Sequence, residues 1–158
     1  MDISFFDSNC HLIPPLRGIS DRDALRSGLA DGTIDAVCSD HAPVDEDAKL
    51  VPFGESEAGA TSIELLLSLV LKWAEEKNIP LAVAVAKVTS VPAKILGIEA
   101  GDLSVGAAAD LCIFDPEQHW RVEASILRSQ GKNTPFLGME LQGKVKYTLA
   151  NGIVVYED

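Results

Sequence analysis

The sequence predicts an α/β protein that ends in a small antiparallel β unit. A short apolar run, Thr33–Ser39, stops abruptly at Asp40 and His41, which is typical of a buried strand carrying polar groups at its C-terminal end. A strongly apolar helical stretch follows at 61–77, and the last fifteen residues alternate around an Asn-Gly pair. We expect the α/β part to cover residues 1–98 and the β unit to cover residues 99–158.

Composition restricts the classes of function. The 158 residues are 47% hydrophobic, which is normal for a globular domain with its own core. The net charge of −11 and the lack of a basic cluster argue against a nucleic-acid or anionic-membrane partner. The longest apolar stretch, Ile63–Trp73, contains Glu64, Ser68 and Lys72 and is too short to span a bilayer.

Cysteine usage and the first residues bear on location. Cys10, Cys38 and Cys112 are odd in number, far apart and form no CxxC pair, which argues against a disulfide framework or a structural zinc site. The residues after Met1 lack the basic and apolar regions of a signal peptide. Both observations predict a cytoplasmic protein.

The first half of the chain is predicted to be mainly helical. Ser20 is expected to cap a helix that ends at Gly32, directly before the strand Thr33–Ser39. The polar stretch 44–59 is longer than an ordinary connection, and its acidic run, Asp45 to Asp47, is interpreted as a solvated surface. Three further helices are predicted, over Thr61–Lys77, Leu81–Val88 and Ala93–Leu96.

The last third is predicted to be a β unit. A strand over Ala109–Phe114 is expected to stop at Asp115-Pro116, because proline removes a ladder hydrogen bond. The alternation at Lys144–Leu149 predicts a half-buried strand. Asn151-Gly152 predicts a hairpin turn, and Ile153–Tyr156 is its return strand.

This set of elements leaves one buried strand, Thr33–Ser39, without predicted neighbours. A parallel sheet needs several strands that are covered on both faces. Two explanations remain open: the chain is part of a larger barrel, or another subunit covers its apolar faces. The second predicts self-association into a homo-oligomer.

A combination of motifs resembles the C-terminal part of a dihydroorotase of the amidohydrolase superfamily, over essentially the whole chain. Pro14-Pro15-Leu16-Arg17 and Ser39-Asp40-His41-Ala42-Pro43, at this spacing, narrow the resemblance to dihydroorotases and close relatives. The supporting motifs are Pro52-Phe53, Gly59, Glu64, Pro92 to Gly97, Gly106, Ala109-Asp110-Leu111 and Phe114-Asp115.

The resemblance implies a fold, a reaction and a role for Asp40. The implied fold is the C-terminal portion of a (β/α)₈ TIM-type amidohydrolase barrel, with Thr33–Ser39 as its eighth strand, plus the β unit. The implied reaction is the zinc-dependent, reversible hydrolysis of dihydroorotate to N-carbamoyl-L-aspartate in pyrimidine biosynthesis. Asp40 matches the aspartate that ligates a metal and serves as general base and acid.

Other family features are absent from this sequence. There is no HxH pair, and His11, His41 and His119 are not at metal-ligand spacing, so each is interpreted as a loop or surface residue. Asp40 alone cannot hold zinc, since a site needs three or four ligands. We therefore expect the chain alone to bind zinc weakly or not at all and to lack activity. Arg17 is interpreted as a surface or ion-pair arginine.

Two departures concern the substrate. Gly59 matches a family position near the substrate, but Val44 and Ile13 stand where the family has a histidine and an asparagine that face it. An unpaired buried carboxylate costs on the order of 1–3 kcal/mol per lost contact. The chain thus resembles the non-catalytic, structural dihydroorotase-like subunit of aspartate carbamoyltransferase complexes. The alternatives are a segment of an active zinc dihydroorotase, or of a hydantoinase or allantoinase.

Overall fold

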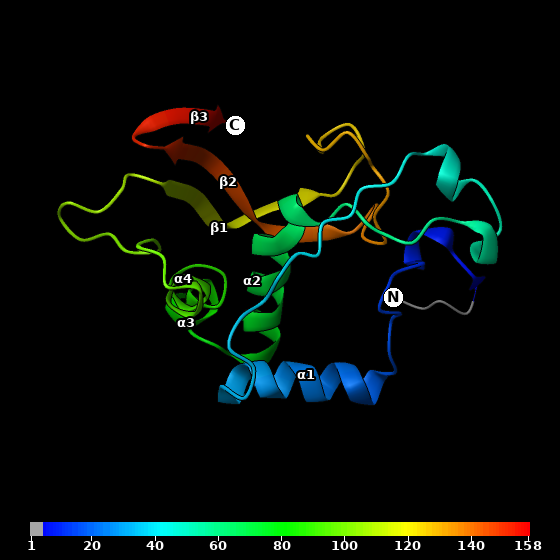
Figure 1. Ribbon diagram of the computed structural model, residues 1–158, viewed down its shortest axis with the longest axis horizontal. Helices are drawn as coiled ribbons and strands as arrows, with labels where there is room; N and C mark the ends of the chain where they lie inside the picture. Colours follow the sequence, from blue (N-terminus) through cyan, green and yellow to red (C-terminus); the bar gives the residue numbers. More distant parts are fainter. Residues whose placement is uncertain (1–4) are drawn as a thin grey trace. The chain divides into compact units, whose positions relative to one another are not determined.

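Over residues 5–158, the computed structural model of the protein contains four α-helices and three β-strands (Figure 1). The helices are α1 (Ile19–Asp31), α2 (Leu66–Lys77), α3 (Leu81–Ala86) and α4 (Ser90–Leu96), and the strands are β1 (Leu111–Arg121), β2 (Glu140–Ala150) and β3 (Ile153–Glu157). The 3₁₀ helices include η2 (Ser8–Cys10), η3 (Asp47–Lys49), η4 (Phe53–Glu55) and η5 (Ile63–Leu65).

The chain divides into two compact units, each made of three separate segments. The first, here named the loop unit, contains the segment that ends at Asp23 together with Ser39–Leu66 and Arg121–Glu140. The second, named the sheet unit, contains Ala24–Cys38, Leu67–Trp120 and Leu141–Asp158.

The three strands form one sheet in the order β1-β2-β3 (Figure 1). Strands β2 and β3 pair antiparallel, with Ala150 opposite Ile153. Asn151 and Gly152 both have positive φ, 49° and 78°, as the favoured two-residue hairpin turn requires. The predicted hairpin and antiparallel β unit are confirmed, and the pairing shifts register between Thr148 and Leu149.

Strand β1 is longer than predicted. The expected stop at Asp115-Pro116 is wrong, since the strand continues to Arg121. Strand β1 lies at one end of the sheet order, where proline is tolerated because one side of the strand needs no partner. The Asp115 carboxylate also accepts hydrogen bonds from the amides of Glu117 (2.9 Å) and Gln118 (3.2 Å).

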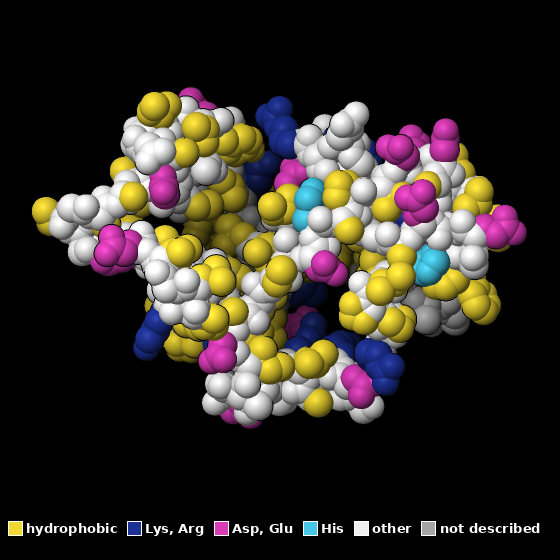
Figure 2. All heavy atoms as spheres, in the orientation of Figure 1, with side chains coloured by type: hydrophobic (Ala, Val, Ile, Leu, Met, Phe, Trp, Pro, Cys, Tyr) yellow, Lys and Arg dark blue, Asp and Glu magenta, His cyan; other side chains and the backbone are white. Residues whose placement is uncertain are grey.

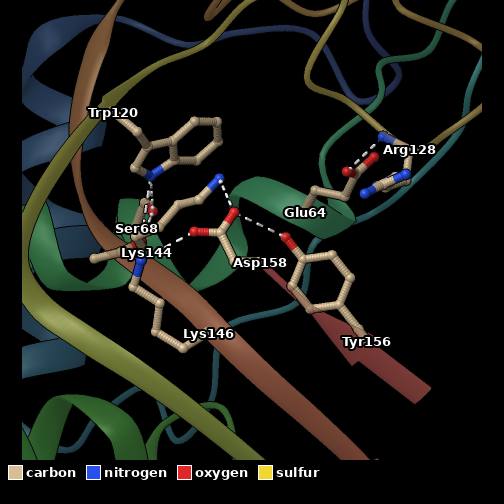
Figure 3. Close-up of polar contacts among 9 residues, drawn as sticks. Glu64, Ser68, Trp120, Arg128, Lys144, Lys146, Tyr156 and Asp158 are labelled. Atoms are coloured by element: carbon tan, nitrogen blue, oxygen red, sulfur yellow. Dashed lines mark hydrogen bonds and ion pairs between the residues drawn. The ribbon is translucent and has the colours of Figure 1, made fainter. Parts of the chain in front are cut away.

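Helix α2 packs against the sheet at Gly143. Gly143 has a φ of 90°, and a Cβ there would collide with Leu71 of α2. Ser68 Oγ donates to the Gly143 carbonyl at 2.9 Å, and the Trp120 indole N–H donates to both Ser68 Oγ (3.1 Å) and that carbonyl (3.2 Å) (Figure 3). The glycine therefore allows the helix and the strands β1 and β2 to approach closely.

A charged cluster lies on the same sheet. The Asp158 carboxylate pairs with Lys144 Nζ at 3.1 Å and Lys146 Nζ at 3.0 Å, and it accepts a bond from the Tyr156 hydroxyl (Figure 3). The hydrogen bond from Lys146 and then that from Lys144 hold the pKa of Asp158 below its ordinary value.

The predicted helices are confirmed with shifted boundaries. The stretch 61–77 consists of η5 followed directly by α2, and α4 begins three residues before the predicted Ala93. Gly97 ends α4 with a φ of 67°. The predicted cap at Ser20 is wrong: α1 begins at Ile19, and Asp21 Oδ2 accepts the Gly18 amide at 3.2 Å, which is one half of a capping box.

The predicted strand Thr33–Ser39 is wrong as a secondary-structure assignment. Across the part of the chain described, this segment joins no sheet and is drawn as a coil (Figure 1). Lys87 holds it instead: the Val37 amide donates to the Lys87 carbonyl, and Lys87 Nζ donates to the Ile34 carbonyl, both at 3.1 Å. A strand is defined by its partners, and the described chain supplies none here.

Many large apolar side chains are exposed, as the space-filling view shows (Figure 2). They include all three consecutive residues at the start of β3, Ile153, Val154 and Val155. Since neighbouring strand residues point to opposite faces, both faces of β3 are exposed. Within residues 5–158, no helix is long and apolar enough to cross a membrane.

Candidate active site

The sequence-predicted site residues all lie in the loop unit. Asp40, Val44 and Gly59 come from its segment Ser39–Leu66, and Ile13 comes from the segment that ends at Asp23. The structure therefore brings the two motif loops into one compact unit, although they are separated in sequence by α1.

Asp40 is held in an unusual backbone conformation. Its φ is 47°, in the left-handed region, which few residues with a side chain adopt and which aspartate tolerates better than most. The residue is exposed, and no hydrogen bond or ion pair of its carboxylate is found among the described residues. The carboxylate is thus free to accept a proton or to ligate a metal.

The residues on both sides of Asp40 are fixed to the chain segment 60–63. Ser62 Oγ donates to the Ser39 carbonyl at 2.6 Å, and the Ala42 amide donates to the Ala60 carbonyl at 3.0 Å. His41 Nδ1 accepts the amide hydrogens of Ser62 (3.1 Å) and Ile63 (3.3 Å). Two backbone donors on Nδ1 assign the ring proton to Nε2.

Gly59 and Val44 pack against each other next to Ala42. Gly59 has a φ of 143°, and a Cβ there would lie 2.5 Å from the Ala42 oxygen and 2.9 Å from Val44 Cγ2. Val44 is 8% exposed, so its side chain belongs to the interior of the unit. The Gly59 amide donates to the His11 carbonyl at 3.0 Å. Only glycine fits this position.

Asn133 was missed by the sequence analysis. Its Oδ1 accepts the Val44 amide at 2.8 Å and its Nδ2 donates to the Gly59 carbonyl at 3.0 Å. Its own carbonyl accepts the Thr61 amide at 2.7 Å. Asn133 thus connects Val44, which follows the Asp40 loop in sequence, to the stretch from Gly59 to Thr61. The available signal was an asparagine between Gly131 and Pro135, a turn-type setting for a side chain that bonds to backbone.

Glu64 has a similar anchoring role. One carboxylate oxygen accepts the amide of Arg128 (Figure 3) and the other accepts the amide of Ser129, each at 2.7 Å. These bonds attach the start of η5 to the segment Arg121–Glu140, on which Asn133 lies.

The proline loop is open to solvent. Ile13 is 76% exposed, and Arg17 makes only a loose pair with Asp21, 3.7 Å from Nε to Oδ2. The interpretation of Arg17 as a surface arginine is confirmed. Asp45, Glu46 and Asp47 are also exposed, as expected for a solvated run.

A buried lysine of the loop unit, Lys49, donates hydrogen bonds to three backbone carbonyls. Lys49 is 7% exposed, and its ammonium donates to the carbonyls of Ser8 (3.0 Å), His11 (3.4 Å) and Glu57. Burial lowers the pKa of Lys49. His11 Nδ1 lies 3.0 Å from Ser56 Oγ and its ring stacks on Phe53. His11 is therefore a structural loop residue.

The donor set for a metal is incomplete within the described chain. Residues 5–158 contain no group of three or more His, Cys, Asp or Glu side chains that could hold a metal ion. Asp40 fits as one ligand, because its carboxylate is a free oxygen donor on a fixed loop. His41 uses Nδ1 for backbone amides, and His119 is exposed on β1 in the other unit.

Comparison with known proteins identifies the family. A profile described as the amidohydrolase family matches residues 11–155. A dihydroorotase of Citrifermentans bemidjiense is 45% identical over 152 residues, which are 96% of this chain and 36% of that protein. A dihydroorotase-like protein of Pseudomonas putida is 44% identical over 151 residues, 96% of this chain and 35% of that protein.

The fold comparison agrees. The solved structure of a D-hydantoinase (dihydropyrimidinase) from Thermus sp. superposes with a TM-score of 0.85 at 26% identity, over 96% of this chain and 34% of that one. The chain thus spans about a third of the length of the relatives that it matches. Its sequence and its fold both show that the chain belongs to the amidohydrolase family.

Proposed function

We propose that this chain is the part of a dihydroorotase-type cyclic amidohydrolase that supplies Asp40 to a metal-dependent hydrolytic site. The observation that carries the proposal is the geometry of Asp40. The backbone on both sides of it is hydrogen-bonded, while its exposed carboxylate has no partner among residues 5–158. A carboxylate kept free on a fixed loop is suited to transfer a proton.

The chemistry assigned to Asp40 is general base and acid catalysis. Its carboxylate accepts a proton from the attacking water and returns it to the amide nitrogen that leaves as the ring opens. In the ring-closing direction the same oxygen accepts the proton from that nitrogen. Zinc, when bound with Asp40 as one ligand, would lower the pKa of water to near 7.

The remaining ligands and the remaining barrel strands must come from outside this chain. We propose that residues 1–98 form the last part of the barrel and that residues 99–158 form the β unit. Thr33–Ser39 joins no sheet among the described residues and would pair as the eighth strand only with the rest of the barrel. The exposed apolar surface supports a covering partner, which is the rest of such a barrel or a second copy of the chain. The chain alone is expected to lack turnover and to bind zinc weakly or not at all.

A chimera tests this function. In it, the 152 matched residues of the Citrifermentans bemidjiense dihydroorotase are replaced by those of this chain. Turnover of N-carbamoyl-L-aspartate by the chimera, lost in Asp40→Asn, supports the proposal. Turnover that survives Asp40→Asn refutes it.

A second candidate function is a structural, non-catalytic subunit of an aspartate carbamoyltransferase complex. It is favoured by two positions that lack a polar group for the substrate carboxylate. Val44 is buried and apolar, and Ile13 is an exposed aliphatic side chain on the proline loop. If the chimera is inactive but gains turnover with Ile13→Asn and Val44→His, the loss of these donors explains the inactivity, and the structural role is preferred.

The solved D-hydantoinase structure keeps a third substrate class open. Assaying the same chimera with hydantoin and dihydrouracil beside dihydroorotate separates the classes. Faster turnover of either ring than of dihydroorotate would assign the chain to the hydantoinase type.

A further inference from the structure

We propose that His41 is a positioning residue for Asp40, acting as a hydrogen-bond acceptor through Nδ1. The inference rests on the proposed function of Asp40 and adds a residue to it. The sequence alone indicates that His41 is a loop histidine next to Asp40, the residue that carries the chemistry. The structure gives its ring a defined set of bonds.

The hydrogen bonds of His41 connect it to the start of η5. Its Nδ1 accepts the amides of Ser62 and Ile63, at 3.1 and 3.3 Å. Ser62 is the cap position of η5, and no side-chain bond from Ser62 itself caps that helix. Amides at the start of a helix have no partner within it, so His41 supplies the acceptor from a distant loop.

Asp40 lies between two residues, Ser39 and His41, that are both hydrogen-bonded to Ser62. Ser62 also donates through Oγ to the Ser39 carbonyl at 2.6 Å. One residue, Ser62, therefore bonds to both chain neighbours of Asp40. Aspartate tolerates a left-handed φ better than most residues with a side chain, and the bonds to Ser39 and His41 help to hold Asp40 in it.

The His41 side chain contributes hydrogen bonding at one ring nitrogen. His41 is half-buried, and the hydrogen bonds of its ring are those from the two amides to Nδ1. What the side chain provides is an acceptor at the position of Nδ1. An asparagine oxygen reaches nearly the same place, while a glutamine oxygen lies one carbon further out.

This difference gives a matched pair of variants, His41→Asn and His41→Gln, with the same functional group. In the full 158-residue chain, nuclear magnetic resonance reports the φ of Asp40 from its chemical shifts and coupling constants. It also reports hydrogen exchange of the Ser62 and Ile63 amides. We expect His41→Asn to keep the left-handed φ and the protection of both amides. In His41→Gln we expect loss of that φ and about tenfold faster exchange.

The same pair in the chimera provides the kinetic readout. His41→Gln is expected to lower kcat by about 10- to 100-fold with little change in KM, as for other residues that orient a ligand, and His41→Asn to restore most of it. Equal behaviour of the two variants in φ, exchange or kcat would overturn the positioning role. Failure of the proposed function is distinct, because it appears as turnover that survives Asp40→Asn, whereas φ and exchange are measured without turnover.

Discussion

Replacing Asn133 by alanine is expected to destabilise the loop unit strongly. The Asn133 side chain makes two hydrogen bonds to backbone, one from the Val44 amide and one to the Gly59 carbonyl. Asn133 is 7% exposed, and both backbone partners are buried. Asn133→Ala leaves both groups unsatisfied at about 1–3 kcal/mol each, so the free energy of unfolding should fall by about 2–6 kcal/mol.

Urea unfolding followed by circular dichroism measures this change. The control is Asn9→Ala, because the Asn9 side chain bonds to Asp7 at an exposed site. Its effect should stay within about 0.5 kcal/mol. If Asn133→Ala costs no more than the control, Asn133 does not hold the two stretches together.

A second variant, Asn133→Asp, separates the two bonds. Its carboxylate still accepts the Val44 amide, but it places a negative charge against the Gly59 carbonyl. Protonation restores a donor, so the deficit relative to the native chain should shrink as the pH falls below the raised pKa of the new carboxyl group. A deficit that is equal at pH 7 and pH 4.5 would contradict this assignment.

Two further changes test other parts of the structure. Gly59→Ala combines a positive φ with a Cβ only 2.5 Å from the Ala42 oxygen, so the free energy of unfolding should fall by about 2–5 kcal/mol. The control is Gly54→Ala, whose Cβ would have no atom within 4 Å and which should lower that free energy by less than about 0.5 kcal/mol. Equal losses for the two variants in urea unfolding would contradict the packing at Gly59. The pKa of Asp158 is lowered in the folded state, so its stabilisation is present above the ordinary aspartate pKa and is lost as the pH falls through the lowered value. The stability difference between the native chain and Asp158→Asn should therefore be present at pH 6 and disappear in acid, and a difference that persists in acid would refute the ion-pair assignment.

The sequence predicted those features that depend on local chemistry. Asn151-Gly152 specifies the hairpin through positive φ at both residues, and Gly97 ends α4 for the same reason. The apolar spacing at 61–77 predicted helix because its period is independent of the partner that buries it. These signals lie within a few residues of the structure that they determine.

The errors concern features that depend on distant partners. Thr33–Ser39 has the composition of a strand, but the described chain provides no neighbouring strand for it. Strand β1 passes through Pro116 because its place in the sheet, which sequence does not reveal, tolerates proline.

Within the candidate site, the motif contained both Asp40 and His41, but it predicted a role only for Asp40, and nothing in the sequence predicted the roles of Ser62 and Asn133. Their roles depend on bonds across 21 to 89 positions of sequence. A single sequence contains no periodicity that reports such contacts, so the partners of these residues could be identified only in three dimensions.

The central claim, that Asp40 is the proton-transferring carboxylate of an amidohydrolase site, is tested most directly by kcat of the chimera with and without Asp40→Asn. Asparagine keeps the size of the side chain and removes its ability to accept the proton. The account predicts that turnover of N-carbamoyl-L-aspartate falls by about 10²- to 10⁴-fold or more, since the variant loses general-base catalysis as well as a candidate metal ligand. A chimera that keeps its turnover within a few-fold after this substitution would contradict the account.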